Sequence, residues 1–314
     1  MDSPGIYIAP PCLSQAPPPP KSSPSSIRKR QQRKPKPAIV PATIFTPQDG
    51  NLAPEIHFPV QTVFAPDRPP YPRFVNRFDS REMLLVIDGS CINNGRSISQ
   101  DEAPTGGCSF MYKSSSSSST SYNTVAAGDP ITFPFLNNKG TGPTSTPTGS
   151  VAFRLEDHGP TGHFAEHTSN RAKLRAVIAA LQFRPWAGEG WRRVVILTDL
   201  SYIVYGATAW LPRWVARRWR KPKRSPRSED GRPGSRFYAN RDLWEELQRR
   251  IEELRGNGCE VSFWLVPGAG YDDADGTGVG SSHIKRAKAA ARMAARQMPE
   301  VQVVEFTRLC GIML

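Results

Sequence analysis

The sequence lacks several features that would assign it to a common class of protein. Its five cysteines are odd in number and form no CxxC pair: Cys12, Cys91, Cys108, Cys259 and Cys310. This pattern excludes a typical zinc site and a disulfide framework, and it fits a reducing compartment. No apolar run reaches the roughly 20 residues that cross a membrane. The stretch MDSPGIYIAPP has no basic start and is interrupted by proline, so no secretory signal is expected.

Acidic residues are scarce relative to basic ones. The chain has 41 Lys and Arg against 28 Asp and Glu, a net charge of +13 and a pI near 9.8. Such an excess favours polyanionic partners, either nucleic acid or an acidic membrane surface, although it is also compatible with a merely soluble basic protein. The run RKRQQRKPK at 28–36 is typical of a nuclear localisation signal or of a solvated tail. We expect an intracellular protein, nuclear or cytoplasmic.

Sustained hydrophobic periodicity is missing from residues 1–80, which hold more than half of the 31 prolines. We therefore predict a disordered, Pro-rich and basic tail there, because such sequence buries little apolar surface. Residues 113–150 contain SSSSSST and Gly, Thr and Pro, and they predict a loop inserted between two strands. The folded domain is predicted to span 81–297, with a basic protrusion at 210–239 and a C-terminal extension at 298–314.

Apolar runs and helical periodicity outline the elements of this domain. Strands are predicted at 83–88, 108–112, 151–156, 194–199 and 259–266, and helices at 168–183, 201–219, 240–256 and 281–297. This order predicts an α/β fold in which helices flank a five-stranded mixed sheet. The continuous apolar runs MLLVID and VVILTD are typical of strands that are covered on both faces.

Two aspartates end these two apolar runs, Asp88 and Asp199. If the strands are parallel neighbours, both carboxylates lie at the edge of the sheet where α/β proteins bind ligands. Two close carboxylates repel one another unless a cation lies between them, and carboxylate oxygens suit magnesium. The alternative is that each aspartate simply ends a strand and begins a turn.

Six motifs follow one another along the chain: DGSCINNGR (88–96), TSNRAKLRA (168–176), TDLSYIV (198–204), a Trp-rich helix, NRDLW (240–244) and FWLVP (263–267). In their order and spacing they resemble type 1 ribonuclease H, and most closely the forms of filamentous fungi. The resemblance covers about 81–297 and implies a ribonuclease H-like fold. It also implies magnesium-dependent hydrolysis of the RNA strand of RNA–DNA hybrids, with two ions held by three aspartates and a glutamate.

The resemblance implies roles for residues at matching positions. Asp88 corresponds to the aspartate that bridges both metals, Asp199 to the third carboxylate and Asp275 to the fourth, with Asp272 and Asp273 as alternatives. Two asparagines match residues that contact the hybrid, Asn94 and Asn170.

The segment 213–236 carries ten Lys and Arg and occupies the place of the family's protrusion, which grips the DNA strand. Its residues include Arg217, Arg218, Arg220 and Lys221. The alternative is a solvated charge run. The helix before them contains Trp210, Trp214 and Trp219, which we expect to pack in the core rather than to stack on bases.

Lys173 stands where the family motif T-x-x-R-A-E has its glutamate. Thr168 or Ser169 can cap this helix, and at about 100° per residue Lys173 faces away from the polar residues Arg171, Arg175 and Gln182. It therefore faces the sheet edge. A cation about 4 Å from a magnesium ion costs on the order of 8 kcal/mol at an effective dielectric constant of about 20. The alternative is that Lys173 extends harmlessly to solvent.

Leu200 is a second departure, because the family has serine after the third carboxylate. Glu166 is a candidate replacement ligand, although its spacing does not favour it. Two interpretations remain: an impaired hybrid-cleaving hydrolase, or a non-catalytic module that binds RNA–DNA hybrid or structured nucleic acid. In either case we expect a monomer that does not bind membranes.

Overall fold

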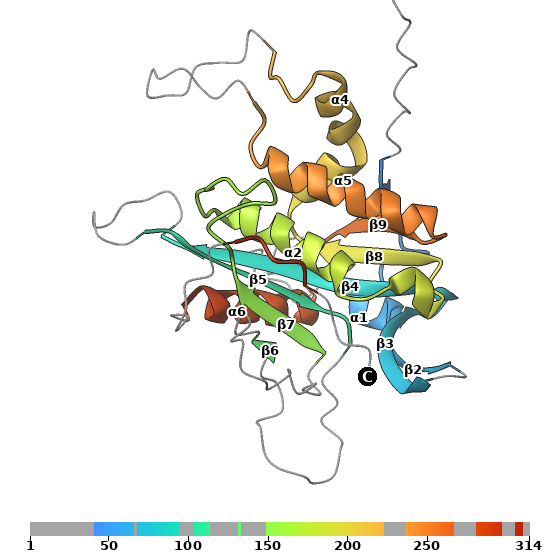
Figure 1. The fold of residues 1–314 in the computed structure, drawn as a ribbon. Coiled ribbons are helices and arrows are strands. Elements are labelled where there is room, and N and C mark those ends of the chain that lie inside the picture. Colours follow the sequence, from blue (N-terminus) through green and yellow to red (C-terminus); the bar gives the residue numbers. More distant parts are fainter. Residues whose placement is uncertain are drawn as a thin grey trace, which may run out of the picture. The chain divides into compact units, whose positions relative to one another are not determined.

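The computed structural model describes residues 41–65, 68–93, 103–113, 131–132, 149–222, 237–266, 281–296 and 305–309. All of them belong to one unit, residues 38–314 (Figure 1). Its helices are α1 (Pro54–His57), α2 (Ser169–Phe183), η1 (Trp186–Glu189), α3 (Ser201–Tyr205), the π-helical η2 (Gly206–Trp210), α4 (Leu211–Ala216), α5 (Arg241–Gly256) and α6 (Ser282–Arg296). None of the helices in these ranges is long and apolar enough to cross a membrane.

A mixed sheet forms the centre of the fold. Its strands are β1 (Thr43–Ile44), β2 (Val60–Ala65), β3 (Arg68–Asn76), β4 (Asp79–Ile92), β5 (Thr105–Met111), β6 (Ile131–Thr132), β7 (Ser150–Arg154), β8 (Arg193–Thr198) and β9 (Glu260–Leu265). Their order is β1-β9-β8-β4-β5-β7-β6, and β3 pairs with both β2 and β4. The long strand β4 is parallel to β8 and antiparallel to β5. The prediction of a mixed sheet flanked by helices is confirmed, and the sheet has more strands than the five predicted.

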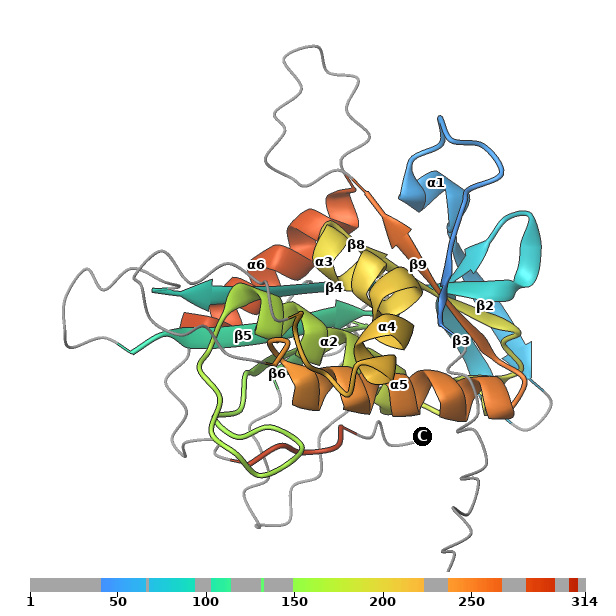
Figure 2. The same ribbon diagram turned by 90° about the horizontal axis from the view of Figure 1, so that it is seen from above.

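Helices cover both faces of this sheet (Figures 1 and 2). Alternate residues of a strand point to opposite faces, and β4 follows this rule. Leu85 and Ile87 belong to the core that contains α2 and α5. Leu84 and Val86 belong to a second core with residues of α6. The sheet is therefore buried on both sides, which explains the unbroken apolar run in β4.

The N-terminal boundary of the predicted domain is wrong, because the fold includes residues from 41 onward. β1 pairs in parallel with β9 at the edge of the sheet, and β3 pairs with β4. Phe58 and Phe74 are fully buried against the α6 side of the sheet. The prolines of β3 precede Val75, where β3 pairs with β2 alone, so one edge of this part of the strand needs no backbone donors. These short elements carry little periodicity of their own and gain their burial from the sheet.

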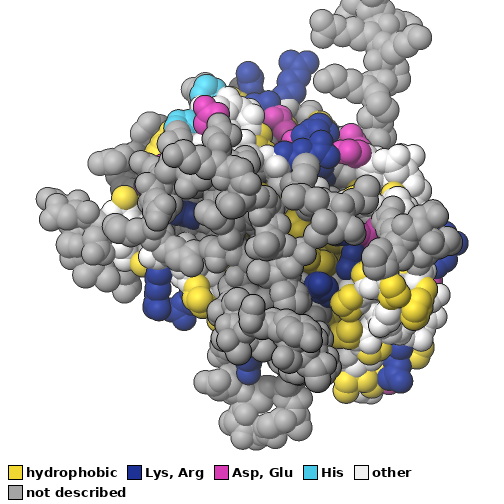
Figure 3. Space-filling view, turned by 60° about the horizontal axis from the view of Figure 1, so that its bottom comes forward, with side chains coloured by type: hydrophobic (Ala, Val, Ile, Leu, Met, Phe, Trp, Pro, Cys, Tyr) yellow, Lys and Arg dark blue, Asp and Glu magenta, His cyan; other side chains and the backbone are white. Residues whose placement is uncertain are grey.

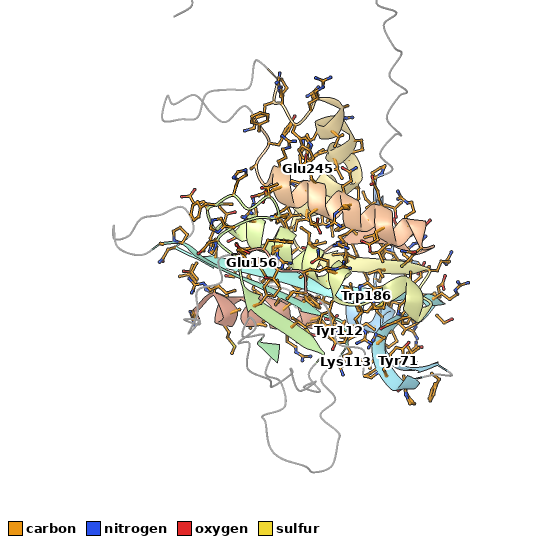
Figure 4. The ribbon with its side chains drawn as sticks, viewed as in Figure 1. Tyr71, Tyr112, Lys113, Glu156, Trp186 and Glu245 are labelled. Atoms are coloured by element: carbon orange, nitrogen blue, oxygen red, sulfur yellow. The ribbon has the colours of Figure 1, made fainter. Side chains whose placement is uncertain are left out.

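A buried ion pair also ties this N-terminal segment to the rest of the fold. Arg73 of β3 donates to Glu189 at 2.9 Å, and both side chains are almost fully buried. The Arg73 guanidinium lies 4.4 Å from the centre of the Tyr71 ring, with Tyr112 and Trp186 also nearby (Figure 4). Carboxylate pairing and aromatic faces together compensate the desolvation of the buried cation.

Two other segments also contribute to the fold. Within the predicted insertion at 113–150, Ile131–Thr132 forms β6 and pairs in parallel with β7, while 114–130 and 133–148 lie outside the described residues. In the C-terminal extension, the Thr307 carbonyl accepts a hydrogen bond of 2.7 Å from Arg175, and Leu309 is buried. Residues 305–309 therefore cover part of α2.

Glu55 of α1 binds the N-terminal end of α6. Its Oε1 accepts hydrogen bonds from the Ser281 hydroxyl at 2.8 Å, the Ser282 hydroxyl at 3.0 Å and the His283 N–H at 3.0 Å. Burial acts to raise the pKa of Glu55, but these donors, the His283 N–H first, hold it below its ordinary value. A carboxylate at this place also suits the positive end of the helix dipole.

We predict that Glu55→Gln lowers the free energy of unfolding by about 1 kcal/mol at neutral pH. Because the folded-state pKa of Glu55 is lowered, its contribution is present above the unfolded pKa and is lost as pH falls through the folded pKa. Urea titrations at several pH values would therefore show the two proteins converging at acidic pH. A difference that is constant from neutral to acidic pH would show that the carboxylate charge does not stabilise α6.

Candidate active site

Helix α2 approaches strand β4 more closely than a side chain would allow. A Cβ atom on Gly89 would lie 2.4 Å from the backbone nitrogen of Lys173 and 2.5 Å from the carbonyl carbon of Ala172. Only glycine permits this contact. The helix begins after Thr168, whose hydroxyl accepts the Arg171 N–H at 3.1 Å as an N-cap. Residue 173 is thereby placed beside Asp88, the residue that precedes Gly89.

The structure brings Lys173, Asp88 and Asp199 together. Strands β4 and β8 are parallel neighbours with Val86 opposite Leu197. Asp88 lies two residues after Val86 in β4, and Asp199 lies two residues after Leu197, directly after the end of β8. Lys173 Nζ lies 2.9 Å from Asp88 Oδ1 and also donates to Asp199 Oδ1. Lys173 is only 8% exposed and therefore does not extend to solvent. The ammonium group thus bridges the two carboxylates.

This ion group lies between the two helical layers of the fold. Asp88 is paired with Ser109 across β4 and β5, and the Ser109 hydroxyl donates to the Ala287 carbonyl of α6 at 2.6 Å. Lys173 comes from α2, on the other layer. It can reach Asp88 because β8 ends at Thr198 and leaves the edge of β4 uncovered beyond that point.

Burial and charge set the ionisation of the group. Burial, the largest effect, raises the pKa of Asp88, the Lys173 ammonium lowers it and the Asp199 carboxylate raises it, with a net rise. Burial acts to lower the pKa of Lys173, but the two aspartates outweigh it and hold that pKa above its ordinary value. Lys173 is therefore a cation at neutral pH. Asp88 Oδ2 is buried and has no hydrogen-bond partner among the described residues.

The polar side of α2, with Arg171, Arg175 and Gln182, does not face solvent, although its polarity would favour an exposed surface. All three residues are buried. Each finds a polar partner on a neighbouring segment: Arg171 with Asp242 at 2.7 Å, Arg175 with Glu156 at 2.6 Å and Gln182 with Glu246 at 2.8 Å. Figure 4 labels Glu156 beside α2. Pairing of this kind lets an amphipathic helix be covered on both sides.

The other predicted site residues are distributed as follows. Asn170 is exposed at the start of α2, where it can contact a ligand. Glu166 is also exposed. Leu200 precedes α3 without capping it and packs against the main core. Four further predicted residues lie outside the described ranges: Asn94, Asp272, Asp273 and Asp275.

The described residues do not fit a pair of magnesium ions. Two carboxylates are present, but the Lys173 ammonium contacts both of them where a metal cation would bind. Compared with a glutamate, a lysine changes the charge of the site by two units towards positive. Within the described ranges no three His, Cys, Asp or Glu side chains form a group that could hold a metal ion.

The protrusion follows α3 and η2, begins with α4 and exposes basic side chains after that helix. Trp214 and Trp219 are buried, and Trp214 stacks on Tyr238 with ring centres 4.9 Å apart. Arg218 and Trp219 both have left-handed backbone conformations, with φ of 51° and 63°. Such backbone costs about 1 kcal/mol per residue, and the packing of Trp219 offsets it. As a result, the side chains on either side of Trp219 face solvent.

These side chains are the predicted nucleic-acid contacts Arg217, Arg218, Arg220 and Lys221. The three arginines are exposed and Lys221 is partly exposed. Within the described part of the chain, none of the four forms an ion pair. Residues 223–236 lie outside it. Figure 3 shows that Lys and Arg side chains also occur at several separate places around the described surface, with fewer Asp and Glu.

The fold and site define an α/β domain with two aspartates at the carboxyl ends of parallel strands, bridged by a helix side chain. A family model described as RNase H matches residues 139–257. The chain is 33% identical over 128 residues to the ribonuclease H of Photorhabdus laumondii, which covers 39% of this chain and 68% of that protein. The chain therefore belongs to the ribonuclease H family.

Other relatives match over a smaller share of their length, and a solved structure aligns with low structural similarity. The chain is 38% identical over 88 residues to the ribonuclease H of Pelobacter propionicus, covering 27% of this chain and 44% of that protein. It spans about half the length of several such curated relatives. A crystal structure of LC9-RNase H1, a type 1 RNase H with the type 2 active-site motif, aligns with 21% identity and a TM-score of 0.34 over 68% of this chain and 72% of that one.

Sequence reasoning missed two residues that build the site. Gly89 is visible in the motif DGS, but its role depends on a helix more than 80 residues away. Ser109 was not singled out, although it connects the strand next to Asp88 with α6. Neither carries a local signal that separates it from an ordinary glycine or serine in a strand.

We predict that Lys173→Met lowers the free energy of unfolding by about 3–5 kcal/mol, because it leaves two buried carboxylates without their cation. Added magnesium should restore part of this loss in the variant, because a cation can again lie between the aspartates. The wild type should not respond. Urea denaturation with and without magnesium measures both effects.

Lys285→Met is the matched control, since it removes an exposed lysine from α6. It should change the stability little, with or without magnesium. If Lys173→Met is as stable as this control, the ion group does not hold the sheet edge and α2 together.

Proposed function

We propose that this protein binds nucleic acid, with RNA–DNA hybrid as its ligand, and that its active site as folded does not support efficient cleavage. The family's reaction is magnesium-dependent hydrolysis of the RNA strand, and the first part of the proposal rests on family membership. The second part rests on one observation, the contact of the Lys173 ammonium with both Asp88 and Asp199.

Electrostatics explains why this contact opposes catalysis. The aspartates are the ligands that the family resemblance assigns to the metal ions, and Lys173 neutralises half of their charge. Repulsion between an ammonium and a dication about 4 Å away is on the order of 8 kcal/mol at an effective dielectric constant of about 20. If the Lys173 side chain adopted another rotamer, the buried carboxylates would lose their cation, and this loss also costs free energy.

Nucleic-acid binding does not depend on this ion group. The exposed arginines of the protrusion lie on a different part of the chain, and Asn170 is exposed at the start of α2. Cations without acidic partners neutralise phosphates and release counterions, which gives affinity that is largely independent of base sequence. Contacts of asparagine with 2′-hydroxyl groups would add the preference for a strand of RNA.

A second candidate is a hybrid-cleaving hydrolase in which another carboxylate replaces the missing glutamate. The buried Asp88 Oδ2, which has no partner among the described residues, favours it, because an unpaired carboxylate oxygen can still ligate. Glu166 is the nearest candidate replacement in sequence. Asp275 would belong to either site and remains a prediction.

A cleavage assay on a labelled RNA–DNA hybrid separates these candidates. We predict little or no magnesium-dependent cutting by the wild type and partial recovery in Lys173→Glu, because that variant supplies a ligand where α2 already meets the aspartates. Recovery is expected to be incomplete, since Leu200 also departs from the family. Asp88→Asn in the Lys173→Glu background should abolish activity again.

Lys173→Gln is the control for charge alone, because it removes the cation without adding a carboxylate. It should remain inactive. Robust cutting by the wild type that disappears in Asp88→Asn would refute the proposal, and Glu166 would then be the next residue to replace.

Binding has its own test. Replacing Arg217, Arg218, Arg220 and Lys221 with alanine should weaken binding to hybrid and to DNA duplex alike. It should also reduce the slope of log affinity against log salt concentration by up to about 4, at about 0.9 per phosphate contact. Fluorescence anisotropy at several salt concentrations measures both quantities. Unchanged affinity and slope would show that these residues only solubilise the protein.

A further inference from the structure

Helix α6 carries a stripe of cations on its outer side. Its residues Lys285, Lys288, Arg292 and Arg296 follow one another at intervals of three or four. At about 100° per residue they fall within roughly 80° of one another around the helix, and the stripe is about 16 Å long. Lys285, Arg292 and Arg296 are exposed and Lys288 is partly exposed. The opposite side of the helix, with Ile284, Ala287 and Ala291, is buried.

The stripe lies on the other side of the sheet from α2 and α5 (Figures 1 and 2). α6 packs on β4, β5 and β7. Its Ala287 carbonyl is bonded to Ser109, the cross-strand neighbour of Asp88, and Gly107 of β5 approaches Ala291 and Ala295. The stripe therefore starts near the level of Asp88 and continues along β5.

A comparison with α5 shows that this stripe is not an ordinary solvated helix surface. In α5, exposed arginines pair with glutamates of the same helix: Arg241 with Glu245 and Arg249 with Glu246. α6 contains no acidic residue at all. Across the described ranges, none of the four cations of the stripe forms an ion pair. Two of α6's cations, Lys285 and Arg286, also lie in its first turns, where the helix dipole disfavours positive charge.

We propose that this α6 stripe is a second nucleic-acid surface, which binds the phosphate backbone of a duplex independently of the protrusion. A stripe of about 16 Å spans roughly five base-pair steps along a duplex axis, at about 3.4 Å each, which suits contact with several phosphates. An anionic lipid surface is the alternative polyanion. The apolar side of α6 is buried against the sheet and is not free to insert into lipid, which favours nucleic acid.

The test compares two variants with equal loss of charge. The stripe variant replaces Lys285, Lys288, Arg292 and Arg296 with glutamine. The control variant replaces four other exposed arginines with glutamine, Arg77, Arg81, Arg192 and Arg249. Three of these control residues lie near the ends of β4 and β8 that are farthest from Asp88. All substituted side chains are at least partly exposed, and thermal melts will establish that both variants are folded.

Anisotropy titrations of a labelled DNA duplex and an RNA–DNA hybrid provide the result. The stripe variant should bind both probes about tenfold or more weakly and with a salt slope reduced by up to about 4, while the control variant stays close to the wild type. Equal affinities and slopes in the two variants would overturn the inference. So would loss of binding to phosphatidylserine vesicles in the stripe variant with duplex affinity unchanged, which would assign the stripe to lipid.

The protrusion variant, with Arg217, Arg218, Arg220 and Lys221 replaced by alanine, separates this inference from the proposed function. If the protrusion variant loses hybrid affinity and the stripe variant does not, the proposed function stands and only the stripe fails. If the wild type binds neither probe, both proposals fail. If the stripe variant alone loses affinity, the stripe rather than the protrusion is the principal binding surface.

Discussion

The packing of α2 directly on the backbone of Gly89 is the constraint on which the candidate active site depends. Because no Cβ separates the two segments, the backbone of residue 173 lies directly on β4. Its side chain therefore faces Asp88 and the end of β8. Whatever side chain stands there determines the charge of the sheet edge. A glutamate would complete a group of carboxylates, whereas Lys173 converts the same geometry into a buried salt bridge of three residues.

Lys173, in place of the family's glutamate, stabilises the fold although it opposes metal-dependent catalysis. Two buried carboxylates need a compensating cation, and in a metal-dependent enzyme the metal provides it. Here the chain carries its own cation, so half of the carboxylate charge at the sheet edge is neutralised as soon as α2 packs on β4. The same solution recurs at other places in the described core, where Arg73 pairs with Glu189 and Arg175 with Glu156. Each pair joins elements that are distant in sequence.

The two faces of the sheet have different surfaces. On one, an ion pair and a hydrogen bond join α2 to α5, and the protrusion extends from this layer with exposed arginines. On the other, α6 packs through alanines and exposes Lys285, Arg292 and Arg296 on its outer side. The N-terminal elements connect to both faces, through Glu189 on one and through the N-terminal end of α6 on the other. Basic side chains that can contact a polyanion are therefore present on both sides of the domain.

Much of the fold could be predicted from the sequence, because the elements that define it are local patterns. The apolar runs ending in Asp88 and Asp199 indicated strands buried on both faces, and the period of 168–183 and 240–256 indicated helices that the structure confirms as α2 and α5. The prediction failed for residues 41–80. β1 is only two residues long, β3 contains three prolines, and both gain their burial from the sheet, so no local pattern marks them.

For the site, the sequence determined which residue types are present: two aspartates after strands, and a lysine on a helix surface away from the other polar side chains. Only the tertiary structure decided what they do to one another. The distance from Lys173 to Asp88, the absence of solvent around both, and the covering of Arg171, Arg175 and Gln182 by α5 and the C-terminal residues all arise from contacts between distant segments. Electrostatic energy depends on separation and burial, and neither quantity is encoded within a single stretch of chain.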